Sequence, residues 1–192
     1  MDLILASTSP YRKALLARLQ HPFRCLPPDT DETPLAGETG AQLALRLALA
    51  KARSVARAHP DALVIGSDQV AELDGRLIGK PGSLENARLQ LTASSGRTVR
   101  FLTGLAVCHA AGELELTHVE PFNVHFRPLT QAAITAYLER EPALDCAGSF
   151  KCEGLGIALF ERMEGDDPSS LEGLPLIALT RLLGEAGYPI LA

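Results

Sequence analysis

The sequence predicts a single α/β domain built on a mixed, twisted β-sheet with flanking helices. Apolar runs typical of buried strands alternate with helical patterns in the first half of the chain. Two long alternating stretches, Thr98 to Cys108 and Glu113 to Phe126, follow later and indicate a hairpin joined through Ala111-Gly112. The 192 residues suffice for one domain or for two small lobes that share a core, and we expect one domain, 1–192.

The first elements are a short buried strand from Leu3 to Ala6 and a helix from about Pro10 to Gln20. The stretch that follows, "PFRCLPPDTDETP", has no regular pattern. Its prolines and aspartates predict a loop. This loop carries the acidic residues Asp29, Asp31 and Glu32.

A second helix is predicted from about Thr39 to about His59, and Pro60 ends it. Its apolar stripe lies along one face, with Lys51 at the edge of the stripe, and consists of Leu43, Leu47, Ala50 and Ser54. Taken alone, Lys51 is most simply interpreted as a lysine that packs its stem on the stripe and keeps its ammonium in water.

The remaining elements alternate between strands and helices. In "ALVIGSDQVAELDG" the pattern predicts two short strands separated by a polar break at Gly66 to Gln69, followed by an Asp74-Gly75 turn. The pattern predicts a helix from Ser83 to about Ser94, a helix from Thr130 to Arg140, a strand interrupted by glycines in "CAGSFKCEGLGIALFERMEGDDP", and an amphipathic helix from Leu174 to Gly184.

Composition and charge exclude several classes of protein. The net charge is −5 and no basic run exceeds a pair, so we expect no nucleic-acid partner, whereas a compact anionic ligand stays open. Asp2 stands where a signal peptide needs basic residues, and no apolar run is long enough to span a membrane. The four cysteines show no Cys-x-x-Cys spacing, which favours free thiols in a reducing cytoplasm.

In the segment "LASTSPYRKALL" an apolar strand runs into a helix that begins with two cations, Arg12 and Lys13. A helix N-terminus already carries partial positive charge, so cations there are locally unfavourable. A strongly anionic ligand would resolve this conflict, because it would also attract the free N–H groups and the hydroxyls of Ser7 and Ser9. The alternative is an ordinary turn in which Ser9 caps the helix, Pro10 is its first residue, and the basic side chains are solvated.

Four further charged residues stand where a charge is poorly explained by folding alone: Glu32, Lys51, Asp68 and Lys80. Asp68 follows an apolar strand, where α/β proteins place ligand-facing residues, although an aspartate there is equally a turn former. Mg²⁺ on phosphates needs one or two carboxylates, and the other phosphate oxygens need cations. No P-loop, dinucleotide fingerprint or nucleophile elbow is present to suggest other chemistry.

Six motifs occur in one order across nearly the whole chain: "LASTSPYRKALL", "DET", "GSDQV", "GKP", "CAGSFKCEG" and "GLPL". Together they resemble the Maf-like nucleotide pyrophosphatases, and within them the YceF-type branch that hydrolyses 7-methyl-GTP. The resemblance implies an inosine triphosphate pyrophosphatase-like fold, with two lobes around a deep cleft. It also implies a cytoplasmic enzyme that cleaves a nucleoside triphosphate between the α and β phosphates, with a divalent metal such as Mg²⁺ or Mn²⁺.

The resemblance also assigns roles to residues. Asp68 matches the proton acceptor that activates water, and Glu32 together with Asp68 matches the metal site. The phosphate-contacting positions correspond to Ser7, Arg12, Lys51 and Lys80. The expected partner is a small nucleotide, and a homodimer stays open.

Three positions differ between branches of this family, and they correspond here to Tyr11, Gln69 and Glu153. A 7-methylguanine ring carries positive charge, so the face of Tyr11 could add roughly 0.5–2 kcal/mol of cation–π attraction. Glu153 could accept charge-assisted hydrogen bonds from the guanine edge. Without the resemblance, Tyr11 is more simply a packing residue and Glu153 a solvated charge.

Three alternatives stay open from the sequence. The first is an enzyme of the same class that acts on dTTP and UTP, the branch that carries Arg, Thr and Gln at the three positions. The second is a nucleotide-binding regulator of septum formation that uses the same cleft without turnover. The third is an anion-binding α/β domain with no assigned role.

Overall fold

A computed structural model describes residues 1–191, which form two compact units. Unit 1 comprises Met1–Gln69, Leu102–Glu120 and the chain from Asp167 onward. Unit 2 comprises Val70–Phe101 and Pro121–Asp166. The expectation that both act as one domain, and that a cleft lies between two lobes, stays a prediction.

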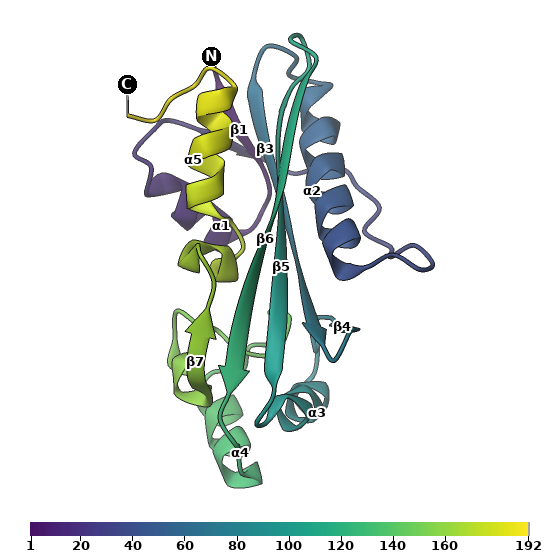
Figure 1. Cartoon of the computed structure of the whole chain (residues 1–192), viewed down its shortest axis with the longest axis vertical. Coiled ribbons are helices and arrows are strands. Elements are labelled where there is room, and N and C mark those ends of the chain that lie inside the picture. The colour runs from purple at the N-terminus through teal and green to yellow at the C-terminus, as the bar shows by residue number, and fades with distance from the viewer. Residues whose placement is uncertain (192) are drawn as a thin grey trace. The chain divides into compact units, whose positions relative to one another are not determined.

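A seven-stranded mixed sheet is the framework of the protein (Figure 1). The strand order is β2-β1-β3-β5-β6-β7, and β4 pairs with β3. Strand β1 is parallel to both β2 and β3, whereas the β3–β4 and β6–β7 pairs are antiparallel. The strands are β1 (Leu3–Ala6), β2 (Arg24–Leu26), β3 (Leu63–Leu73), β4 (Arg76–Ile78), β5 (Thr98–His109), β6 (Leu114–Phe126) and β7 (Phe160–Glu164).

In unit 1, helices cover both faces of the sheet (Figure 1). Helix α2 (Gly40–Ala56) packs its alanines on one face, whereas α1 (Pro10–Ala17) and α5 (Leu176–Glu185) pack leucines on the other. Helix α2 begins with a capping box, in which Thr39 and Gln42 satisfy each other's backbone N–H groups. A short 3₁₀ helix, η2 (Pro168–Glu172), precedes α5.

Two glycines let α2 approach the sheet unusually closely. A Cβ atom on Gly66 of β3 would collide with the backbone oxygen of Ala48, and one on Gly104 of β5 would collide with that of Ala44. The sheet therefore presents bare backbone to the helix at two neighbouring strands. This close contact fixes the height and rotation of α2, and with them the position of Lys51.

Unit 2 contains helices α3 (Leu84–Ser94), capped by Ser83, and α4 (Gln131–Arg140), capped by Thr130. It also contains a 3₁₀ helix, η1 (Leu155–Leu159). Its core includes four aromatic rings that meet edge to face, with centroids 4.8–5.5 Å apart: Phe101, Phe126, Phe150 and Phe160. These rings give unit 2 its own packing centre.

The structure confirms the predicted α/β class and most elements but corrects several boundaries. The predicted polar break at Gly66 to Gln69 is wrong, because β3 runs unbroken through it. The polar side chains are tolerated there because they find partners: Ser67 Oγ, for example, lies 2.8 Å from the Gly104 oxygen. The Asp74-Gly75 turn is confirmed, and both residues have the positive φ that a tight hairpin turn requires.

Two segments were predicted wrongly. The loop predicted after the first helix contains the short strand β2, which pairs with β1 and in which no residue is fully buried. The glycine-interrupted strand is mostly turns and η1, and only β7 is a strand. Backbone φ is positive at Gly148 and Ser149, which is incompatible with a continuous strand. Along residues 1–191, no helix combines the length and apolar character needed to cross a bilayer.

Candidate active site

A cluster of opposite charges lies where α2 meets β3. Lys51 Nζ is 2.6 Å from Asp68 Oδ1 and 2.6 Å from Glu32 Oε1. Lys51 is 6% exposed and Asp68 is 9% exposed, whereas the Glu32 side chain is largely in water. The interpretation of Lys51 as a solvated, snorkelling lysine is therefore wrong, since its ammonium is withdrawn from water and held between two carboxylates.

The sheet topology explains why this cluster lies at an accessible place. The last pair of the β1–β3 ladder is Leu5 with Ile65, and β3 continues for eight residues beyond it, to Leu73. Asp68 is therefore inside its own strand, not past the end of it as the sequence suggested. It does lie past the carboxyl end of the neighbouring strand β1, which is where parallel sheets place ligand sites.

Arg12 joins the same cluster electrostatically. The carboxylates of Asp68 and Glu32 raise the pKa of its guanidinium, but desolvation outweighs them and lowers that pKa overall. Arg12 Nε donates a 2.8 Å hydrogen bond to the Gly173 oxygen, directly after η2. The backbone of a distant segment thereby holds the guanidinium in place. A phosphate site needs a fixed cation of this kind.

At the strand-to-helix turn, the structure agrees in part with each of the two interpretations, an anion site and an ordinary capped turn. Ser9 caps α1 through its contact with the Arg12 N–H, and Pro10 is the first helical residue, as the ordinary-turn alternative requires. Lys13 is exposed, also as that alternative predicts, whereas Arg12 is half-buried and bonded. The buried Ser7 hydroxyl accepts a hydrogen bond from the Ser9 N–H. Only Arg12 therefore departs from a turn of purely structural character.

Gln69 belongs to the opposite face of β3 from Asp68, because adjacent strand residues alternate. Its Nε2 lies 2.8 Å from the Ser170 oxygen, 3.1 Å from the Leu171 oxygen and 3.1 Å from Thr103 Oγ1. The side-chain amide is thus fixed against η2. Asp68 and Gln69 therefore lie on one strand but contact different segments, Asp68 helix α2 and Gln69 the 3₁₀ helix η2.

The other sequence-predicted residues are placed as follows. Tyr11 is half-buried on α1 in unit 1. Lys80 and Glu153 belong to unit 2 and are exposed, Lys80 between β4 and α3 and Glu153 just before η1. The structure therefore brings together Arg12, Glu32, Lys51 and Asp68. The roles of all nine residues stay predictions.

The donor set suits a divalent metal that is shared with a substrate. Among residues 1–191 no group of three or more His, Cys, Asp or Glu side chains could enclose a metal ion. Glu32 and Asp68 nevertheless direct oxygens at one cation, the Lys51 ammonium. Two carboxylates with open positions are what Mg²⁺ uses when phosphates and water complete its shell. The residues present therefore fit a metal brought together with a nucleotide.

The loop that carries Glu32 is tied to α2 by one arginine. Arg46 makes a two-pronged ion pair with Glu38, with Nε to Oε1 at 2.6 Å and Nη2 to Oε2 at 2.9 Å, and also donates to the Thr33 oxygen at 3.0 Å. The bond from Arg46, with a further one from the Leu35 N–H, lowers the pKa of Glu38 to about 2. This anchor orders the segment directly after Glu32.

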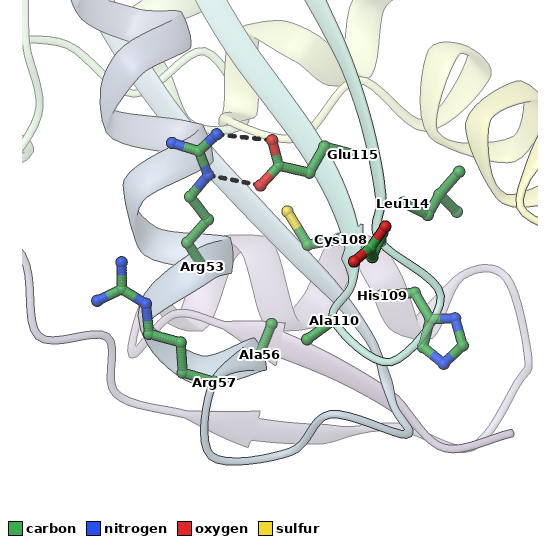
Figure 2. A pocket seen from close by; sticks show the side chains of 9 residues that line it. Arg53, Ala56, Arg57, Cys108, His109, Ala110, Leu114 and Glu115 are labelled. Atoms are coloured by element: carbon green, nitrogen blue, oxygen red, sulfur yellow. Dashed lines mark hydrogen bonds and ion pairs between the residues drawn. The ribbon is translucent and has the colours of Figure 1, made fainter.

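A pocket lies at another place in unit 1, where the C-terminal turns of α2 face the β5–β6 hairpin (Figure 2). It has a volume of about 390 Å³, and Arg53 and Glu115 form a two-pronged ion pair across it, each bond 2.6 Å long. Burial raises the pKa of the Cys108 thiol in its wall to about 11. None of the residues predicted to act on a substrate lines this pocket.

Sequence reasoning missed Thr103, Ser67 and the backbone oxygens of η2. Ser67 Oγ contacts the oxygens of Gly104 and Gly173 at 2.8 and 2.9 Å, and Thr103 Oγ1 contacts the Ser170 oxygen at 3.0 Å. The signal for Thr103 was present, since it is a hydroxyl residue in the otherwise apolar run "FLTGLAV". The backbone oxygens leave no trace in a sequence.

A family model described as "Maf-like protein" matches residues 2–186, so the chain belongs to the Maf-like family. Among curated proteins, one from Xanthomonas axonopodis pv. citri (strain 306) is named 7-methyl-GTP pyrophosphatase. It is 57% identical over 188 residues, which cover 98% of each chain. The family resemblance predicted from the six motifs is confirmed.

One solved structure supports the fold. A HAM1 protein from Coxiella burnetii is 19% identical, with a TM-score of 0.53 over 96% of this chain and 99% of that one. The Staphylococcus aureus Ham1 protein is 17% identical, with a TM-score of 0.46 over 66% of this chain and 72% of that one. The likeness to the first of these extends over nearly the whole of both chains, and the predicted fold class is confirmed.

Proposed function

We propose that this protein is a nucleoside triphosphate pyrophosphatase that hydrolyses 7-methyl-GTP to 7-methyl-GMP and pyrophosphate. Membership of the Maf-like family and 57% identity to a protein named 7-methyl-GTP pyrophosphatase support the reaction class and the substrate. The structural observation that carries the proposal is the ion cluster of Lys51, Asp68 and Glu32 beyond the end of β1. A buried charge cluster at this position suits phosphate chemistry.

Asp68 is the proposed proton acceptor. Its Oδ1 is bonded to Lys51. Its Oδ2 has no hydrogen-bond partner among residues 1–191. The one side-chain oxygen or nitrogen there that is both buried and without a partner is Thr30 Oγ1, so Asp68 Oδ2 is in contact with solvent. One carboxylate oxygen is thus fixed by a cation while the other is available to take a proton from the attacking water. Water oxygen bonds to phosphorus, the α–β phosphoanhydride bond breaks, and pyrophosphate departs.

Cations would offset the charge of the triphosphate. Arg12 is fixed by the Gly173 oxygen and Lys51 by two carboxylates, so neither has to be reoriented from water during the reaction. Ser7 and Lys80 are proposed to contact phosphate oxygens on the strength of the family motifs. Glu32 and Asp68 would hold a divalent metal, which when bound supplies Lewis-acid charge neutralisation at the phosphates.

Tyr11, Gln69 and Glu153 are the proposed base-reading residues. A cationic purine suits the aromatic face of Tyr11 and the carboxylate of Glu153 better than thymine does. The dTTP and UTP branch stays the alternative within the family, and a non-catalytic regulator of septum formation is the alternative outside enzymology. The regulator has less use for a water-activating carboxylate such as Asp68, whose second oxygen is in contact with solvent.

We also propose a cytoplasmic location. Cys25, Cys108, Cys146 and Cys152 are all free thiols in the structure, as is usual in a reducing compartment. The absence of a nucleic-acid partner stays a prediction from the sequence, and a homodimer stays open.

The test is pyrophosphate release from 7-methyl-GTP, GTP, dTTP and UTP by the purified protein, each with Mg²⁺, with Mn²⁺ or with a chelator. We expect the highest kcat/KM for 7-methyl-GTP in the presence of metal. A preference for pyrimidines would keep the catalytic residues and overturn the base-reading ones. No pyrophosphate from any nucleotide would overturn the enzymatic proposal in favour of the regulator.

A further inference from the structure

The amide of Gln69 is oriented without ambiguity. Two of the three atoms that contact its terminal nitrogen are backbone oxygens, those of Ser170 and Leu171, at 2.8 and 3.1 Å. A backbone oxygen can only accept, so the atom facing η2 must be the NH₂ group and not the side-chain oxygen. The third contact is Thr103 Oγ1, at 3.1 Å.

The other end of the amide, Oε1, is left available. It has no hydrogen-bond partner within residues 1–191, and the one buried side-chain nitrogen or oxygen there without a partner is the Thr30 hydroxyl. Gln69 Oε1 therefore lies at the protein surface, where it can accept a hydrogen bond. Free glutamine offers a donor and an acceptor, but in this protein Gln69 presents only an acceptor.

Thr103 supports this orientation of the amide. Its hydroxyl has one proton, and the Ser170 oxygen, 3.0 Å away, can only accept it. The Thr103 oxygen is thereby left as an acceptor toward Gln69 Nε2. Thr103 and Gln69 lie on neighbouring strands, β5 and β3, and one turn of η2 satisfies both.

We propose that Thr103 is a positioning residue that holds the Gln69 side chain so that only its oxygen, a hydrogen-bond acceptor, is available to the base. The base that Gln69 contacts must then carry a proton on a ring nitrogen. Guanine and hypoxanthine have this N–H next to a carbonyl, whereas the corresponding nitrogen of adenine is itself an acceptor and is repelled. Positive charge on a methylated guanine strengthens the N–H as a donor. This inference rests on the proposed role of Gln69 in base reading.

The test compares ITP with ATP, because ITP carries the ring N–H without the 2-amino group of guanine. In the wild-type protein we expect kcat/KM for ITP to exceed that for ATP by at least about tenfold. Thr103→Val keeps the shape and removes the hydroxyl, and should reduce this ratio by about fivefold, mainly through KM for ITP. Thr103→Ser keeps the hydroxyl and should restore the ratio.

The matched control is Thr180→Val, since the Thr180 hydroxyl contacts the Leu176 oxygen within α5 and has no link to Gln69. It should leave the ratio of ITP to ATP unchanged. Equal kcat/KM for the two nucleotides in the wild type, or the same ratio in Thr103→Val as in the wild type, would overturn the inference while leaving pyrophosphatase activity established.

A binding measurement separates the inference from the proposed reaction. The α,β-methylene analogues of GTP and ATP cannot be cleaved at that bond, and their Kd values can be measured by calorimetry. We expect tighter binding of the GTP analogue, and a smaller difference in Thr103→Val. If no nucleotide is hydrolysed but this pattern holds, the proposed reaction fails and the inference stands. Equal Kd values would overturn the inference.

Discussion

Lys51 Nζ and Asp68 Oδ1 lie 2.6 Å apart, with both residues at least 90% withdrawn from water. Desolvating two charges costs free energy that their attraction only partly returns, so apolar residues of similar size would stabilise a fold at least as well. Apart from Gly40, the other buried residues of α2 are indeed leucine, alanine and valine. An ion pair in this place is therefore better explained by chemistry than by stability.

Replacing the proposed proton acceptor should separate chemistry from folding. Asp68→Asn keeps an oxygen that can accept from Lys51 but cannot take a proton from water. We expect kcat to fall by about 10²–10⁴-fold with the thermal unfolding temperature changed by only a few degrees. Pyrophosphate release and circular dichroism melts check this. The control is Asp74→Asn, in an exposed turn, which should retain activity. An active, well-folded Asp68→Asn protein would disprove the assignment.

Removing the cation of the cluster should affect stability as well. Lys51→Met leaves Asp68 buried without its partner, so we expect the free energy of unfolding to fall by about 3–5 kcal/mol and activity to be lost. Denaturant titration measures the first effect. Arg181→Met removes a cation from an exposed pair with Glu185 and should cost less than about 0.5 kcal/mol. Equal stability of the two variants would mean that the Lys51 pair is not buried in solution.

Most of the fold could be predicted from the sequence, because local patterns decide it. The caps at Ser9, Thr39, Ser83 and Thr130 were visible as hydroxyl residues before helical patterns. Strand β2 was not predicted because it has three residues, none of them fully buried, and they show no alternating pattern. The unbroken course of β3 escaped because its polar side chains find partners on distant segments, which no local pattern records.

The candidate site likewise has parts that could be predicted from the sequence and parts that could not. Charged residues out of place in a pattern, such as Asp68 and Lys51, could be found from the sequence. Their pairing could not, because it depends on how closely α2 approaches the sheet. Neither could the orientation of Gln69, since it depends on backbone oxygens of η2 that lie about a hundred residues away in the chain.

The close approach of α2 can be tested at Gly104. An added methyl group in Gly104→Ala would collide with the backbone of Ala44, so the helix must shift. We expect a loss of about 1–3 kcal/mol of stability and a fall in activity as Lys51 moves from Asp68. Gly184→Ala is the matched control, because its methyl group meets nothing within 4 Å and a helix favours alanine. A stability gain in both variants would contradict the tight packing.

The loop anchor should make stability depend on pH. The pKa of Glu38 is lowered from 4.5 to about 2 by Arg46, so the ionised form is favoured in the folded state. Its stabilising contribution is complete above about pH 4.5 and is lost as the pH falls toward about 2. We therefore expect Glu38→Gln to have a lower melting temperature than the wild type at pH 7, and the difference to decrease as the pH falls. Melting curves from pH 2 to 7 measure this, with Glu185→Gln as a surface control. A gap that stays constant with pH would refute the role of the charge.

Metal dependence tests the remaining part of the site. Because the described side chains supply only two carboxylates, phosphate and water must complete the coordination shell, and the metal should bind weakly without nucleotide. We expect a chelator to abolish turnover and Glu32→Gln to raise the Mg²⁺ concentration for half-maximal activity by roughly tenfold or more. Asp31→Asn, in the same loop, keeps an oxygen for the Thr33 N–H and should leave it unchanged. Calorimetry with Mn²⁺ and a non-hydrolysable nucleotide gives a second readout. Full activity in chelator, or unaltered metal affinity in Glu32→Gln, would remove Glu32 from the metal site.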